Sequence, residues 1–302
     1  MKNHIRFLGF YLICLLALSL WIVACTRSSV PPESVESAVP TGTSVVSEGG
    51  QARPNMFQPS VSYAVAWVAS DESLGIREPA GISGSIVSEL VYDQRGVELT
   101  GAITQLGSST WVEIHSPLGG TGWVNSWNLT EEKAAGEFCA DPRVLTILET
   151  LGRSILEQDG QSLLGIVNPN RGLIFRHNWW NPEVAVAPES VSGIFSDLTE
   201  IEWGVLSGSD FPIRGSFQQL IIPQLLDVFE HEPQVSCNEL LIGLTTREMI
   251  WRGEYRNLNF YAFHRPAPTG GNDFDWRTWV VGIEYLGGQP YLTLLIQYRG
   301  DI

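Results

Sequence analysis

The chain has 302 residues, of which 44% are hydrophobic and 17% charged, and its formal net charge is −15. This length suits about two domains of 100–200 residues each. No run of Lys or Arg occurs, so the composition excludes nucleic acid as a partner and offers no electrostatic attraction to anionic lipid.

The N-terminal residues 1–25 have the pattern of an export signal. Lys2 and Arg6 precede an uncharged, mostly apolar run of about 18 residues (7–24), which just reaches the length of a membrane-spanning helix. A basic start, an apolar core and a small residue at the exit are typical of a secretory signal peptide. An uncleaved transmembrane anchor is the alternative. Both interpretations send residues 26–302 across the membrane, because the positive flank stays inside.

The apolar run ends in Ile22, Val23, Ala24 and Cys25. This stretch resembles the lipobox of bacterial lipoproteins, in which an aliphatic residue and two small or β-branched residues precede a Cys. The resemblance implies that the Cys25 sulfur receives a diacylglycerol and that the chain is cut just before it. Acyl chains such as palmitate contribute about 0.8 kcal/mol per buried CH₂ to membrane binding. The expected location is therefore extracytoplasmic, lipid-anchored in the cell membrane, at the cell surface or in the periplasm.

Residues 26–60 are rich in Ser, Pro, Thr, Gly and Glu, with almost no large apolar residue before Met56 and Phe57. Such a stretch cannot bury enough apolar surface to offset the entropy lost on ordering. We expect a disordered tether that lifts a folded head off the membrane.

Residues 61–130 are predicted to be all-β, because short apolar runs alternate with turns rich in Gly, Pro, Asp and Ser. The order of five pieces resembles the bacterial SH3-like (SH3b) domain, a small β-barrel. These pieces are LGIREPAG (74–81), VSEL (87–90), RGVELTGAI (95–103), WVEIH (111–115) and TGWVNSWNL (121–129). The resemblance implies a module that binds cell-wall peptide or another envelope ligand.

By the same resemblance, the candidate ligand-binding residues of this module are one cation and four aromatic residues: Arg77, Tyr92, Trp111, Trp123 and Trp127. Trp123 and Val124 are neighbours on a predicted strand, so they point to opposite faces and cannot both fill one core. The sequence leaves open which of Trp111 and Trp123 faces outward.

Residues 139–302 are predicted to form a second domain, of α+β class, after a linker or short helical joint at 131–138. Asp141 is a predicted N-cap and Pro142 the first residue of a helix with one apolar stripe. A second helical run, 216–229, contains a proline that should kink or split it. Strand-like runs occupy 172–180, 183–188, 257–266, 276–285 and 291–298, and the last two are joined by a Gly-Gly turn typical of a hairpin.

Four cysteines occur, of which Cys14 lies in the leader and Cys25 is the expected lipidation site. The remaining pair, Cys139 and Cys237, is expected to form a disulfide in an exported chain. The alternative is a catalytic thiol at Cys139, which precedes a helix whose N-terminus could lower its pKa. That alternative leaves the other cysteine unpaired in an oxidising compartment.

The sequence contains no phosphate loop, dinucleotide fingerprint, serine-hydrolase elbow or His-Glu-x-x-His, so no metal or cofactor is predicted. His177 and His264 each end a strand-like run and could meet in the fold, although a hydrogen-bonded or surface role is the simpler interpretation. Asp273 and Asp275 lack the ligand density that a calcium site needs.

Two further segments are candidates for recognition. Trp179 and Trp180 stand between polar residues, and neighbours on a strand point to opposite faces, so at least one could stack on a sugar or a peptide. Residues 201–217 are punctuated by glycine and are predicted to be a functional or connecting loop.

These observations support three hypotheses. The first is a non-enzymatic lipoprotein, attached to the membrane through its N-terminal lipid, that binds peptidoglycan or another envelope ligand. The second is a cell-wall hydrolase with its active centre in residues 139–302, and the third is a scaffold subunit that binds an envelope protein.

Overall fold

The computed structural model describes residues 56–209 and 211–300, all within one compact unit of the chain. This part is mostly β-structure with several short helices, and its strands form sheets of seven, six and two strands. The leader, Cys25 and most of the predicted tether lie outside the described residues. Among the residues that are described, no helix has both the length and the apolar character needed to cross a bilayer.

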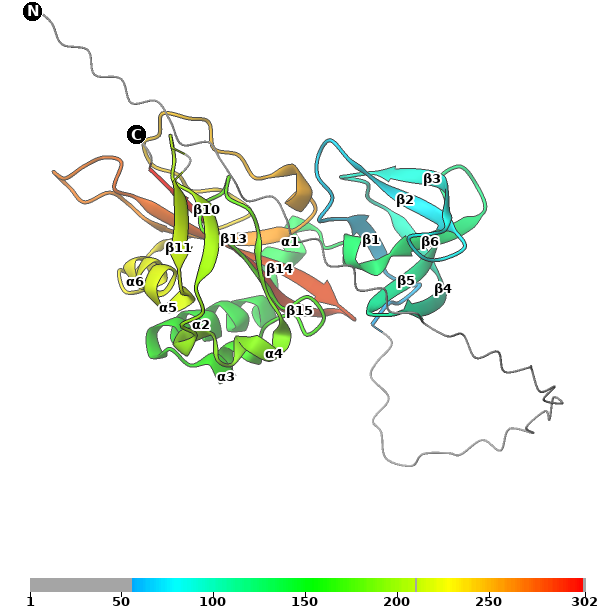
Figure 1. The fold of residues 1–302 in the computed structure, drawn as a ribbon, viewed down its shortest axis with the longest axis horizontal. Helices are drawn as coiled ribbons and strands as arrows, with labels where there is room; N and C mark the ends of the chain where they lie inside the picture. The colour runs from blue at the N-terminus through cyan, green and yellow to red at the C-terminus, as the bar shows by residue number, and fades with distance from the viewer. Residues whose placement is uncertain (1–55, 210, 301–302) are drawn as a thin grey trace, which may run out of the picture. The chain divides into compact units, whose positions relative to one another are not determined.

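The first sheet, whose strands β1 to β6 are labelled in Figure 1, has the strand order β3-β2-β6-β5-β4-β1-β7. Every pairing in it is antiparallel. In chain order its strands are β1 (Ser62–Val65), β2 (Ser73–Glu78), β3 (Ser85–Val91), β4 (Val97–Leu106), β5 (Ser109–His115), β6 (Thr121–Asn125) and β7 (Leu129–Glu131). The predicted all-β character of 61–130 is confirmed. Because β3 and β7 stand at opposite ends of the order, hydrogen bonds do not close this sheet into a barrel.

The first sheet surrounds its own apolar core, which extends into the end of the predicted tether. Inward-facing residues such as Val112, Ile114 and Val124 are fully buried in it. Phe57, assigned to the tether by sequence, is 9% exposed and packs in the same core, with Met56 against it. Met56 and Phe57 therefore belong to the folded module and not to the tether that the sequence predicted there.

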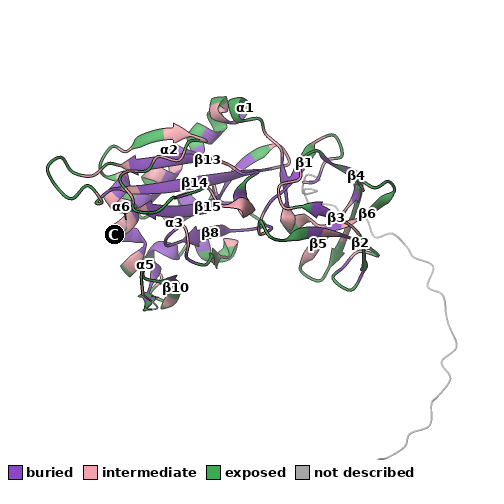
Figure 2. Cartoon of the chain, turned by 90° about the horizontal axis from the view of Figure 1, so that it is seen from above, coloured by how far each residue is buried: buried purple, intermediate pink, exposed green. Residues whose placement is uncertain are grey.

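The second sheet has the order β12-β13-β14-β15-β8-β9, with β8 parallel to β15 and the other pairs antiparallel. Its strands are β8 (Leu173–Arg176), β9 (Val184–Val186), β12 (Gln234–Cys237), β13 (Asn259–Arg265), β14 (Arg277–Leu286) and β15 (Gln289–Arg299). The three longest strands, β13 to β15, are buried along most of their length (Figure 2). The predicted C-terminal hairpin is confirmed, with Gly287 and Gly288 at positive φ in its turn.

Helices cover one face of the second sheet and an irregular segment covers the other. The helices are α1 (Ala135–Ala140), α2 (Pro142–Glu157), α3 (Gly160–Leu164), α4 (Pro188–Val191), α5 (Phe217–Leu220) and α6 (Ile222–Phe229), with short 3₁₀ turns η1 (Ser126–Asn128), η2 (Ile194–Ser196) and η3 (Gly253–Tyr255). Apolar residues of α2 and α6 share one core with the sheet, whereas Met249, Tyr255 and Leu258 belong to the core on the opposite face. The second domain predicted as α+β therefore contains helices on a mainly antiparallel sheet.

The local signals in the helical segments are confirmed. The Asp141 carboxylate caps α2 by accepting a hydrogen bond from the Arg143 amide, and Pro142 is the first helical residue. The second helical run is split into α5 and α6, with one residue, Ile221, between them. Pro223 lies in the first turn of α6. Ser216 and Gln219 form a capping box at the start of α5, which fixes where that helix begins.

Residues 201–217 are not the loop that the sequence predicted. They contain a hairpin of β10 (Ile201–Val205) and β11 (Pro212–Gly215). Trp203 anchors it, since this ring is fully buried and its indole N–H donates to the Gly215 carbonyl at 2.9 Å. The free energy gained by burying this large aromatic ring outweighs the tendency of the glycines to interrupt the strands.

Asp141 should make stability depend on acid pH. The Arg143 guanidinium hydrogen-bonds the carboxylate and holds its pKa well below the ordinary value of 3.8. A carboxyl whose pKa is lower in the folded state contributes stability at neutral pH and loses it below about pH 4. Asp141→Asn keeps a good cap without the charge, whereas Asp141→Ala removes the cap and should cost about 1 kcal/mol. Denaturant unfolding at about pH 7 and about pH 3 should show a smaller acid loss for Asp141→Asn than for the unmodified chain; equal losses would contradict this role.

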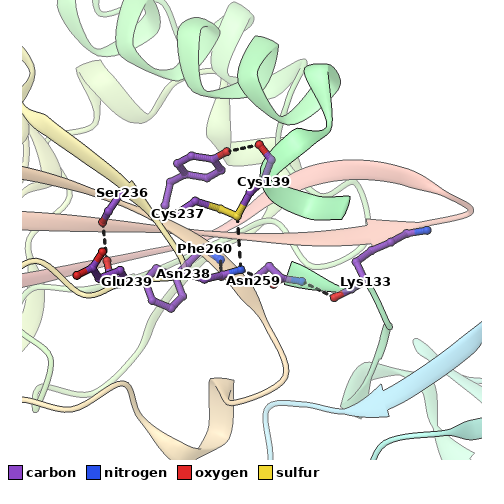
Figure 3. Close-up of a disulfide and its surroundings, with 9 residues drawn as sticks. Lys133, Cys139, Ser236, Cys237, Asn238, Glu239, Asn259 and Phe260 are labelled. Atoms are coloured by element: carbon purple, nitrogen blue, oxygen red, sulfur yellow. Dashed lines mark hydrogen bonds between the residues drawn. A yellow bond between two sulfur atoms is a disulfide. The ribbon is translucent and has the colours of Figure 1, made fainter. Parts of the chain in front are cut away.

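A disulfide joins Cys139 of α1 to Cys237 of the edge strand β12, with the two Cα atoms 5.9 Å apart (Figure 3). The Tyr261 hydroxyl donates to the Cys139 carbonyl at 3.0 Å. The Asn238 amide, next to the bond, donates to the Asn259 side chain at 2.8 Å. The bond therefore fixes the segment that connects the first sheet to α2 onto the edge of the second sheet.

Candidate functional site

A cleft of about 850 Å³ is lined by five segments of the chain: Met56 and Phe57, the β4–β5 turn, residues 125–129, the loop before β8 and the end of β14. This volume falls within the usual range of small-molecule sites. Most of the polar side chains that line it are amides and hydroxyls, namely Gln105, Ser108, Ser109, Thr110, Asn125, Ser126, Asn168, Asn170 and Tyr285. Trp127 is the exposed large aromatic residue of the lining, with 45% of its surface accessible.

Trp127 is held in place by a local cap. It lies in η1, which follows β6 directly. The Asn125 side-chain oxygen accepts the Trp127 amide at 3.0 Å and so caps this turn. An Asn at this position satisfies a backbone donor that the end of the strand leaves free. The short sequence Asn-Ser-Trp-Asn therefore ends a strand and turns one indole toward the cleft.

Arg171 lies sandwiched between two indole rings at the cleft. Its guanidinium carbon is 4.1 Å from the centre of the Trp127 ring and 4.3 Å from the centre of the Trp67 ring. One Arg171 nitrogen also donates to the Trp127 carbonyl at 2.6 Å. A guanidinium over an indole face is the most favourable cation–π geometry, and it covers one face of each ring.

Glu284 of β14 neutralises this arginine. The carboxylate accepts the Arg171 Nε–H at 2.8 Å, and the side chains of the two residues are only 4–5% exposed. The Trp67 indole donates to the same carboxylate at 3.0 Å, and the Asn168 amide donates at 3.4 Å. The charged pair at the cleft is therefore buried, paired and surrounded by hydrogen bonds, and it joins the first sheet to the second.

Trp67 takes an unusual backbone conformation at this site. Its φ is +64°, a left-handed value that large residues rarely adopt, and its amide donates to the Glu254 carbonyl at 2.7 Å. Such strain persists only where the surroundings determine it, and it costs of order 1–3 kcal/mol. The hydrogen bond to Glu284, the stacking on Arg171 and an edge-on contact with the Tyr255 ring, 5.1 Å between centroids, hold this ring in place.

The structure brings one of the five residues assigned by the SH3b resemblance to the cleft, and that residue is Trp127. Trp111 is 4% exposed and cannot stack on a ligand, which corrects its assignment. It lies on the face of β5 opposite to that of the core residue Val112, and its cross-strand partners are Thr104 and Asn125. Tyr92 is half-buried against the first core.

Trp123 and Arg77 lie side by side on the face of the sheet away from the core. They are cross-strand partners, and Trp123 is half-buried while its neighbour Val124 is in the core, as strand alternation predicts. The Arg77 guanidinium donates to the carbonyls of Ile82 and Gly84 at 3.1 and 2.8 Å. Arg77 therefore stabilises its own hairpin loop, and neither residue lines the cleft.

Trp179 and Trp180 are both half-buried and also lie outside the cleft. The Trp179 ring stacks nearly parallel to the Tyr298 ring, with centroids 6.3 Å apart. The Trp180 ring contacts the Trp179 ring edge-on, with centroids 5.9 Å apart. These ring contacts cover much of the aromatic surface of Trp179 and Trp180 that the sequence suggested for ligand binding.

An ionic cluster around the buried Arg176 side chain was not predicted, and the Glu183 side chain in it is 37% exposed. Its guanidinium contacts the carboxylates of Glu183 and Glu254 at 3.3 and 2.9 Å, and its Nε donates to the Tyr255 hydroxyl at 2.7 Å. The Tyr255 hydroxyl donates to Glu183 in turn. Both carboxylates are bound by the Arg176 guanidinium, so these contacts have a structural role and hold β8 against η3.

The candidate catalytic residues do not form a reactive arrangement. Cys139 is bonded to Cys237 and so carries no thiolate. His177 is 3% exposed and contacts the Gln224 amide, and burial lowers its pKa to about 4. His264 contacts the Thr278 hydroxyl at 2.8 Å. Within the described residues, no group of three or more His, Cys, Asp or Glu could hold a metal ion.

Comparison with known proteins finds no matching family model, no similar curated protein and no similar solved structure. The geometry of the cleft is therefore what bears on function. Hydroxyls and amides around one aromatic ring are suited to binding a polar ligand.

Proposed function

We propose that this protein is a membrane-anchored extracytoplasmic lipoprotein that binds a cell-envelope polymer. In this proposal the first sheet is an SH3b-like module, and Cys25 carries the lipid anchor. The observation that carries the binding function is the cleft, where Trp127 is exposed beside amide and hydroxyl side chains. The module supplies Trp127, and the second sheet supplies the Arg171–Glu284 pair that supports its ring.

Several features support binding over catalysis. The cleft is lined mostly by neutral polar groups, and its two charged residues are bonded to each other. Cys139, the nucleophile of the hydrolase hypothesis, is in a disulfide. An aromatic ring with a few placed polar groups around it is a common lining for a ligand-binding site.

Co-sedimentation with purified peptidoglycan sacculi tests the binding function. The full chain, purified in detergent, should pellet with sacculi and stay in solution without them. An unrelated lipidated protein of similar net charge is the control, because it reports trapping through the anchor. Recovery in the supernatant at every sacculus concentration would overturn the proposal.

Replacement of Cys25 tests the anchor. In cells fed labelled palmitate, the unmodified chain should carry the label and fractionate with membranes. Cys25→Ala should lose the label, because no sulfur is present to form the thioether; Cys14→Ala is the matched control and should keep it. If the unmodified chain is membrane-bound without label, the transmembrane-anchor alternative holds instead.

A further inference from the structure

The chemistry of the cleft indicates which part of an envelope polymer it binds. We propose that the ligand is a neutral, N-acetylated sugar chain and not a charged peptide. This inference rests on the proposed binding function and adds the class of ligand to it.

The cleft offers no free charge to a ligand. Arg171 and Glu284 are the two charged residues in the lining, and each neutralises the other at 2.8 Å in a buried position. A carboxylate or ammonium group entering the cleft would give up water and find no opposite charge free to replace it. Burial of an unpaired charge is strongly unfavourable, so the cleft selects against the ends and ionised side chains of peptides. A neutral ligand carries no such cost.

The Trp127 ring offers an apolar surface to a ligand. The guanidinium of Arg171 covers one face of Trp127 at 4.1 Å, and 45% of the residue is still exposed to solvent. The C–H face of a pyranose ring is apolar and flat, and it can pack on the open part of an indole that is already held rigid. A rigid aromatic ring offers this area with little loss of conformational entropy on binding.

Hydrogen-bonding groups in the cleft suit an acetamido group and sugar hydroxyls. The Asn125 side-chain oxygen accepts the Trp127 amide, which directs the Asn125 NH₂ group away from that bond. Within the described part of the chain, this NH₂ group and the hydroxyls of Ser108, Ser109 and Ser126 make no hydrogen bond, and all four residues line the cleft. An amide N–H suits the carbonyl of an acetamido group, and serine hydroxyls both donate and accept, as sugar hydroxyls do.

Titration of the full chain with two probes tests the ligand class. The probes are a β-1,4-linked oligomer of N-acetylglucosamine and a pentapeptide with free carboxylates, and calorimetry measures the binding of each. The oligosaccharide should bind and the peptide should not. The affinity for the oligosaccharide should be the same at low and high salt, because salt screens only interactions between charges.

Three variants locate the binding to the cleft. Trp127→Ala should weaken oligosaccharide binding at least about tenfold, as expected for a central aromatic contact. Asn125→Asp keeps a good cap but replaces the donor with a negative charge, so it should weaken binding while the protein stays folded. Trp123→Ala is the matched control, since this half-buried tryptophan of the same module lies outside the cleft, and its affinity should be unchanged.

The outcomes separate this inference from the proposed function. Retention on sacculi together with binding of the peptide but not the oligosaccharide overturns the ligand class and leaves the binding function intact. Oligosaccharide binding that survives both Trp127→Ala and Asn125→Asp shows that the ligand sits elsewhere and also overturns it. Failure to bind sacculi, oligosaccharide and peptide overturns both proposals.

Discussion

Removal of the Cys139–Cys237 disulfide is expected to lower the free energy of unfolding by about 2–5 kcal/mol. The two cysteines are 98 residues apart in sequence, so the bond closes a long loop in the unfolded chain. The entropy estimate for a loop of that length is about 4–5 kcal/mol, the upper part of this range. The bond also fixes α1 to the edge strand β12, so its loss should weaken the connection between the two large sheets.

The double variant Cys139→Ala/Cys237→Ala measures this effect without leaving a free thiol. Its denaturation midpoint should fall below that of the unmodified chain, and dithiothreitol should lower the midpoint of the unmodified chain only. The variant serves as its own control for reduction, since it has no bond to break. A midpoint that is unaffected both by the double substitution and by reductant would show that the bond does not stabilise the fold.

The disulfide and the secondary structure around it belong to the part of the fold that could be predicted from sequence. The cap at Asp141, the split at Pro223 and the Gly-Gly hairpin each rest on interactions between residues close in sequence. Strand alternation likewise placed Trp123 and Val124 on opposite faces. The hairpin around Trp203 was not predicted, because the glycines in the sequence indicate a loop. The burial of Trp203, which stabilises the hairpin, depends on tertiary packing that the local sequence does not reveal.

The candidate site could be predicted only in part, for a related reason. Trp127 stood out because of its family-like segment. Arg171 and Glu284 have no local signal: each is a single charged residue, and 113 residues separate them. Trp67 lies in the stretch predicted to be all-β, yet its φ is positive, and its amide donates to Glu254, a residue remote in sequence. A buried ion pair becomes recognisable only when the fold brings its members together.

Glu284→Ala is expected to destabilise the protein by about 3–5 kcal/mol, the usual cost of leaving one member of a buried ion pair without its partner. The substitution leaves the Arg171 guanidinium buried between two indole rings with no countercharge. It also removes the acceptor of the Trp67 indole N–H. Glu284→Gln, which keeps the shape and one acceptor, should cost less than Glu284→Ala. Denaturant unfolding of each variant measures these differences.

A double-mutant cycle separates the pair from its surroundings. Arg171→Met and Glu284→Leu should each destabilise strongly, but the double variant should be much less destabilised than their sum, because no buried charge is left unpaired. Near-ultraviolet circular dichroism should change in every variant that lacks Arg171, since that guanidinium contacts the rings of Trp67 and Trp127. If the two single effects simply add, the residues do not act as a pair. The cycle also bears on recognition: a double variant that is stable yet binds the oligosaccharide weakly would mean that the Arg171–Glu284 pair contributes to binding apart from its effect on stability.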